Sequence, residues 1–271
     1  MIEMKWIYEI ILIVYGFSLI GYFIDFIHNN RKANRIAFWL LTMVWLIQTI
    51  FFIYEVFVEN NFPVATLVDS LLFYSWVLIT FSLIINRLFP VRFIVFFMNV
   101  FGFFILLMYV SASATKRFPD EAIHFVHEIL IMHITVAIIS YGFFTIGFLF
   151  SIMYLVQYRL LKKKKGLKWL WRLGDLGALD SYSFKTISIG VPLLLIAIIM
   201  GVVWAYVSTT TFYWLDMKTI GSIVVLFVYI VYLVLRINGH EGKFLSTYNT
   251  AAFLILLINF FLFSSLSNFH F

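Results

Sequence analysis

The run VPLLLIAIIMGVVWAYV, residues 191–207, contains no charged side chain and no alternation of apolar and polar residues. A helix needs about 20 apolar residues to cross about 30 Å of hydrocarbon, and this run approaches that length. A strand of a membrane β-barrel would instead alternate apolar and polar residues over about ten positions. We therefore expect this run to form most of one transmembrane helix.

The composition of the whole chain extends this expectation. Of the 271 residues, 63% are hydrophobic and 12% are charged, and the mean hydropathy is +1.02. Soluble domains are about 45–50% apolar, so this chain has too much apolar surface for a water-soluble core. The chain has no cysteine, which excludes disulfides, thiolate metal sites, thioether attachment of haem and thiol catalysis within it.

Charge clusters divide the chain into eight apolar runs, which predict an all-α, polytopic transmembrane helical bundle. We expect one integral membrane domain over residues 1–271, with a basic cytoplasmic loop at 158–185. The predicted spans are 6–27, 36–57, 67–86, 93–112, 129–157, 186–207, 219–236 and 248–267.

The distribution of Lys and Arg predicts the orientation of these spans. Fifteen of the 19 basic residues fall in loops on one side, and four fall on the other, namely Lys5, Lys116, Arg117 and Lys218. Cytoplasmic loops carry the excess of basic residues, so both termini are expected outside. The net charge of +6 reflects this asymmetry and indicates no nucleic-acid partner.

The basic loop contains the segment KKKKGLKWLWRLGDLGALDSYSFK, residues 162–185. Its leucines and tryptophans, interleaved with cations, are typical of a segment lying at the anionic inner leaflet. The same segment could also be the docking site of a cytoplasmic partner. The residues alone leave both interpretations open.

Several polar and aromatic residues are predicted to gather on the outer side. They are His124, His127, His133, Tyr213, Trp214, Asp216 and His270. Aromatic residues at this level usually form the interfacial belt, and a loop histidine is usually solvated. Two imidazoles beside an aromatic surface could also ligate haem iron. In HEILIMH, His127 and His133 are six residues apart and do not share a helix face, which argues against the HExxH zinc motif of metalloproteases.

Five stretches together resemble the cytochrome c assembly superfamily, whose members are integral membrane proteins that handle haem. The stretches are NFPVATLVDSLLFYSW at 61–76, IMHITVAIISYG at 131–142, SFKTISIGVPLLLIAIIMGVVWA at 183–205, FYWLDMKTIGSIVVLFVYIVYLVLR at 212–236 and NFFLFSSLSNFHF at 259–271. They occur in the family's order and cover most of residues 60–271.

The resemblance implies a haem site on the outer face. His133 and His270 match the family's two external histidines, so haem b would be bound non-covalently with both as axial iron ligands. Tyr213, Trp214 and Asp216 match the aromatic loop that cradles haem, although several of the family's tryptophans are missing. His127 is a further candidate for the site.

Two departures from the family suggest what the protein does. Asn61 and Val234 stand where transporting members have two further histidines within the membrane. This reduced form resembles a branch found beside haem-biosynthesis genes in Gram-positive bacteria, and its members are implicated in lowering the level of glutamyl-tRNA reductase. The resemblance thus implies a non-enzymatic, haem-binding regulator in the bacterial cell membrane, with the reductase as a partner of the cytoplasmic loop.

Two other functions stay open. The first is a haem transporter or system II cytochrome c assembly subunit that delivers haem to the outer face. The second is a secondary transporter of another solute, which would place charges near the bilayer midplane. Asp69 is the one candidate for such a charge.

Overall fold

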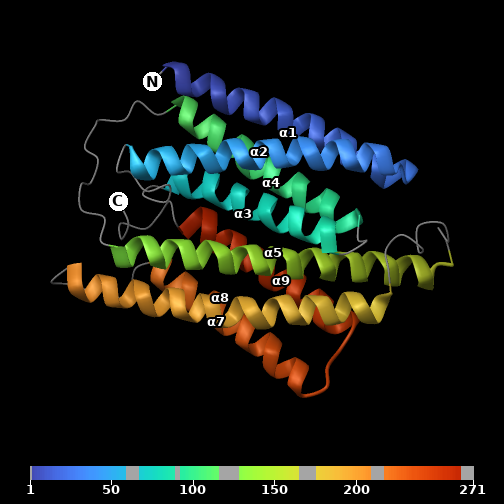
Figure 1. Ribbon diagram of the computed structural model, residues 1–271. Coiled ribbons are helices and arrows are strands. Elements are labelled where there is room, and N and C mark those ends of the chain that lie inside the picture. The colour runs from blue at the N-terminus through green and yellow to red at the C-terminus, as the bar shows by residue number, and fades with distance from the viewer. Residues whose placement is uncertain are drawn as a thin grey trace. The chain divides into compact units, whose positions relative to one another are not determined.

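The computed structural model describes residues 2–58, 67–88, 92–115, 128–164, 175–208 and 217–263, and nearly all of these residues are in helices (Figure 1). Eight helices are long and apolar enough to cross a membrane, which confirms the predicted all-α, eight-span fold. They are α1 (Ile2–His28), α2 (Arg31–Phe57), α3 (Leu67–Leu88), α4 (Arg92–Thr115), α5 (Glu128–Lys162), α7 (Leu176–Ser208), α8 (Met217–Ile237) and α9 (Lys243–Ile258). A π-helical turn, η1 (Asn259–Phe263), continues α9.

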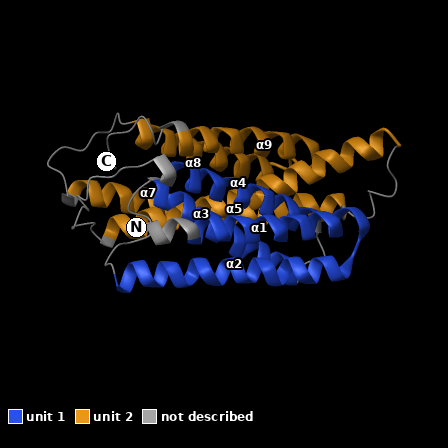
Figure 2. Ribbon diagram, turned by 90° about the horizontal axis from the view of Figure 1, so that it is seen from above, with its two compact units in different colours: residues 1–126 blue, residues 127–271 orange. Residues whose placement is uncertain are grey.

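The chain divides into two compact units, Met1–Val126 (unit 1) and His127–Phe271 (unit 2), coloured separately in Figure 2. In unit 1, α1 packs against α2, α2 against α3, α3 against α4, and α4 against α1, so the four helices form a closed ring. Unit 2 has an equivalent ring in the order α5, α7, α8 and α9. Each unit is therefore a four-helix bundle with its own core.

In unit 1, small and polar residues let the helices approach closely. The hydroxyl of Ser18 on α1 donates to the carbonyl of Ala37 on α2 at 2.9 Å. A Cβ on Gly21 would lie 2.9 Å from the Cβ of Ala37. Deeper in the bundle, Asn99 on α4 accepts a hydrogen bond from Tyr15 at 3.2 Å. Small residues and paired polar groups are the usual means of joining helices in a membrane, where burial of apolar surface provides no driving force.

Part of the segment 158–185, for which the sequence predicts a basic cytoplasmic loop, is helical. Helix α5 continues to Lys162, and its 35 residues span about 52 Å, well beyond the hydrocarbon thickness. Helix α7 begins at Leu176, where the Oδ2 atom of Asp175 accepts the backbone N–H of Ala178 at 3.1 Å. This side chain caps the first turn of a helix that starts ten residues before the predicted start at 186.

Candidate functional site

Of the predicted haem-site residues, the structure describes His133, which lies near the start of α5. The other predicted site residues, and His124, lie outside the described residues. These are His127, Tyr213, Trp214, Asp216 and His270.

The imidazole of His133 is held by two residues of α7. Its Nδ1 atom lies 2.5 Å from the backbone carbonyl oxygen of Ala197. One helical turn further along, a Cβ on Gly201 would lie 2.7 Å from Cε1, 2.9 Å from Nδ1 and 3.2 Å from Nε2 of the same ring. The ring therefore packs directly on the backbone of α7, in space that a larger residue at 201 would fill.

The contact with Ala197 assigns the tautomer of His133. A carbonyl oxygen only accepts hydrogen bonds, so Nδ1 must carry the proton. In the neutral ring, Nε2 is then the nitrogen with the lone pair. Histidines that bind metals commonly donate the other ring N–H to a carbonyl or carboxylate in this way.

Further hydrogen bonds from side chains to backbone carbonyls join α5 and α7 along their length. Ser140 on α5 donates to the carbonyl of Gly190 on α7 at 2.8 Å. Ser183 on α7 donates to the carbonyl of Gly147 on α5 at 3.1 Å. Since the residue numbers run in opposite directions on the two helices, α5 and α7 are antiparallel. His133 sits at one end of this paired surface.

Helices α8 and α9 contribute polar groups to the same end of unit 2. Lys218, in the first turn of α8, is near enough for its positive charge to act on the imidazole of His133. Asn259, the first residue of η1, donates to the hydroxyls of Tyr141 at 3.3 Å and Ser222 at 3.4 Å. This side chain joins the end of α9 to α5 and α8. Single π-turns within helices are frequent at functional sites, and this one precedes the segment that carries His270.

The described part of the chain contains no group of three or more His, Asp or Glu side chains that could hold a metal ion. It therefore holds no zinc site of the usual kind, which needs three or four protein ligands. One oriented imidazole suits a metal that brings most of its own ligands, as haem iron does. Haem iron takes only one or two axial ligands from the protein.

Asp69, Asn61 and Val234 are the other positions singled out in the sequence, and Asn61 lies outside the described residues. Asp69 is partly buried in the first turn of α3, where the helix dipole favours an acidic side chain. Val234 is 49% exposed on α8.

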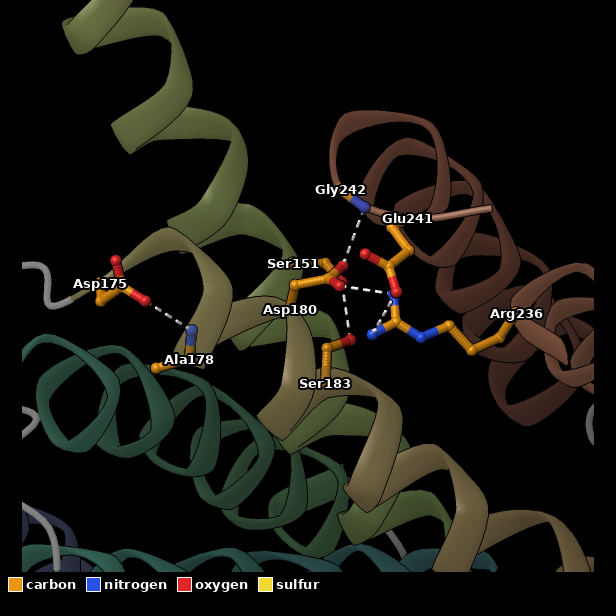
Figure 3. A network of polar contacts seen from close by, with 8 residues as sticks. All are labelled: Ser151, Asp175, Ala178, Asp180, Ser183, Arg236, Glu241 and Gly242. Atoms are coloured by element: carbon orange, nitrogen blue, oxygen red, sulfur yellow. Dashed lines mark hydrogen bonds and ion pairs between the residues drawn. The ribbon is translucent and has the colours of Figure 1, made fainter. Parts of the chain in front are cut away.

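The opposite end of unit 2 holds a polar network that the sequence did not reveal (Figure 3). Asp180 in α7 is buried, and its Oδ2 atom accepts from the guanidinium of Arg236 in α8 at 2.5 Å. Its Oδ1 atom accepts the backbone N–H of Gly242, at the start of α9, at 3.1 Å. Arg236 also lies 3.5 Å from Glu241. One carboxylate therefore links three helices. The sequence predicts a loop at Asp180 and therefore gives no sign of this role.

Comparison with known proteins places the chain in a family. A model of the cytochrome C assembly protein family matches residues 64–270. Protein HemX of Bacillus subtilis (strain 168) is 47% identical over 260 residues, which are 96% of this chain and 94% of that protein. Protein HemX of Brevibacillus brevis is 39% identical over 273 residues, covering 100% of this chain and 99% of that protein.

A more distant relative is the cytochrome c biogenesis protein CcsA of Chlamydomonas reinhardtii, which is 33% identical over 197 residues, 68% of this chain and 53% of that protein. No solved structure matches the chain. The chain belongs to the cytochrome c assembly protein family, is similar over its full length to the HemX proteins, and is a multi-pass protein of the bacterial cell membrane.

Proposed function

We propose that this protein is a non-enzymatic haem-binding regulator that lowers the level of glutamyl-tRNA reductase. The observation that supports the haem-binding part is the imidazole of His133, whose Nδ1 atom donates to Ala197, because histidines that bind metals commonly donate the other ring N–H in this way. The regulatory part rests on the resemblance to the branch that lies beside haem-biosynthesis genes. It also rests on the full-length similarity to the HemX proteins.

The described residues fit haem. Haem combines an iron centre with an apolar macrocycle and two carboxylates. The His133 nitrogen suits the iron, the apolar helices around it suit the macrocycle, and the nearby cation of Lys218 suits a carboxylate. Bound haem would supply an iron centre, and His133 and, in our proposal, His270 would hold it.

Regulation requires that haem favour one conformation of the protein over another. A ligand that binds two states equally well changes nothing, whatever its affinity. Helix α5 runs from His133 to the basic end of unit 2, where Arg159 and Lys162 lie in its last turn. We propose that haem occupancy alters how this basic end engages glutamyl-tRNA reductase.

The alternative function is delivery of haem to the outer face for cytochrome c assembly. The observation in its favour is the similarity to CcsA, a cytochrome c biogenesis protein. Against it, Asn61 and Val234 stand where transporting members have histidines, and neither side chain can replace an imidazole at iron.

The two functions are separated by an experiment in the native bacterium. Strains that lack the gene, or carry wild type, His133→Ala or His270→Ala, are compared for the abundance of glutamyl-tRNA reductase and of c-type cytochromes. Our proposal predicts that reductase rises in the deletion strain and in both variants, while c-type cytochromes persist. Unchanged reductase together with lost c-type cytochromes would instead establish the assembly function.

A further inference from the structure

Two backbone features of α7 meet the side chain of His133. The carbonyl of Ala197 accepts its Nδ1 proton, and Gly201 leaves the space in which the ring lies. In a continuous α-helix, the Ala197 carbonyl also accepts the N–H of residue 201, and a carbonyl oxygen has two lone pairs for the two donors. The contact therefore costs α7 no hydrogen bond.

We infer that Ala197 and Gly201 are positioning residues for the haem ligand, fixing both the tautomer of His133 and the plane of its ring. This inference rests on the proposed function, because it concerns the same imidazole. It assigns a role to two residues whose own side chains cannot bind a cofactor. Glycine suits position 201 because a Cβ there would lie 2.7 Å from Cε1 and 2.9 Å from Nδ1, so that the ring or the helix would have to shift.

Fixing the tautomer matters because only a nitrogen with a lone pair can bind iron. If the ring were free to turn, either nitrogen could carry the proton. A ring protonated on the nitrogen that faces the iron would have to lose that proton before this nitrogen could bind. A hydrogen bond from the other nitrogen also makes the ligand more basic. Loss of such supporting contacts typically weakens metal binding by about 10- to 100-fold.

Helix α7 offers a matched control for crowding. A Cβ on Gly190 would lie 2.8 Å from Cε1 of Phe144, another ring of α5. Gly190→Ala therefore disturbs the α5–α7 contact about as severely as Gly201→Ala does, but away from His133. An effect of general packing would appear in both variants, whereas an effect on the imidazole would appear only in Gly201→Ala.

The first test is a haem titration of purified wild type and of the two glycine variants, followed by absorption and electron paramagnetic resonance spectra. We expect Gly201→Ala to bind haem about 10- to 100-fold more weakly, with an altered low-spin spectrum, and Gly190→Ala to bind as wild type does. In a His133→Ala background, Gly201→Ala should cause no further loss. Equal weakening by both glycine variants, or wild-type binding by Gly201→Ala, would overturn the inference.

The second test needs no variant at position 201 and no haem. Nitrogen NMR of histidine-labelled wild type in detergent, above the ordinary imidazole pKa of about 6.5, reports which ring nitrogen carries the proton. The His133 signal is the one missing from His133→Ala. A proton on Nδ1 supports the inference, and a proton on Nε2 overturns it. If wild type binds no haem, the proposed function fails while the NMR result still decides the role of Ala197.

Discussion

Replacing Asp180 by Asn removes the charge at the centre of the network in Figure 3 while keeping the shape of the side chain. The carboxylate accepts one hydrogen bond from Arg236 and one from Gly242, and its side chain is 9% exposed. Breaking a buried ion pair costs about 3–5 kcal/mol when the remaining charge is left uncompensated. In this variant Arg236 still has Glu241 at 3.5 Å. That ion pair contributes little to stability, because the side chain of Glu241 is 68% exposed.

The free energy of unfolding should therefore fall by about 2–3 kcal/mol, because the introduced amide can still accept from Gly242 and Arg236 keeps a partial partner. The assay is reversible unfolding in mixed micelles, followed by circular dichroism as the denaturing detergent is increased. The matched control is Asp175→Asn, five residues earlier in the chain. Asp175 caps α7, and Asn caps as well as Asp does, so this variant should stay within about 0.5 kcal/mol of wild type.

A double-mutant cycle with Arg236→Met isolates the pair. The loss in the double variant should be smaller than the sum of the single losses, because each single variant already breaks the same contact. If Asp180→Asn stayed within about 0.5 kcal/mol of wild type, or if Asp175→Asn were equally destabilising, the buried pair would not stabilise the protein as we infer.

Two further predictions concern the packing of unit 1 and the orientation of the helices. Gly21→Ala places a Cβ 2.9 Å from that of Ala37 and should destabilise the protein by about 1–3 kcal/mol in the same unfolding assay. Gly16→Ala is the control, because its new Cβ meets one side-chain atom at an ordinary 3.8 Å, so equal losses would contradict the packing argument. Since the chain has no cysteine, single-cysteine labelling has no background. Lys163→Cys should react only from the cytoplasm and Met217→Cys only from outside, and the reverse pattern would reject the predicted orientation.

The eight spans were predictable because length and hydropathy alone are enough to specify them. The start of α7 was not, because its first turns carry polar residues such as Asp180 and Ser183. In a sequence, such residues are typical of a loop. Here each is paired with a residue of another helix, because Asp180 accepts from Arg236 and Ser183 donates to the carbonyl of Gly147. Polar residues that pair across helices cannot be told from solvated ones before the packing is known.

His133 was predicted from the family resemblance, but the residues that hold it were not. The hydrogen-bond acceptor is the backbone carbonyl of Ala197, and every residue has such a group. The one available signal was Gly201, because a glycine within an apolar helix often marks a close approach of another helix. That signal does not say which side chain approaches. The division of the chain into two four-helix units was likewise not visible in the hydropathy pattern.

A haem titration of the purified protein shows whether His133 binds haem iron. The comparison is wild type, His133→Ala and His240→Ala, the last being an exposed histidine in the turn between α8 and α9. We expect wild type and His240→Ala to bind one haem with the absorption spectrum of bis-histidine ligation, and His133→Ala to lose this spectrum. Absence of haem binding by wild type, or an unchanged spectrum and affinity in His133→Ala, would show that His133 is not a haem ligand.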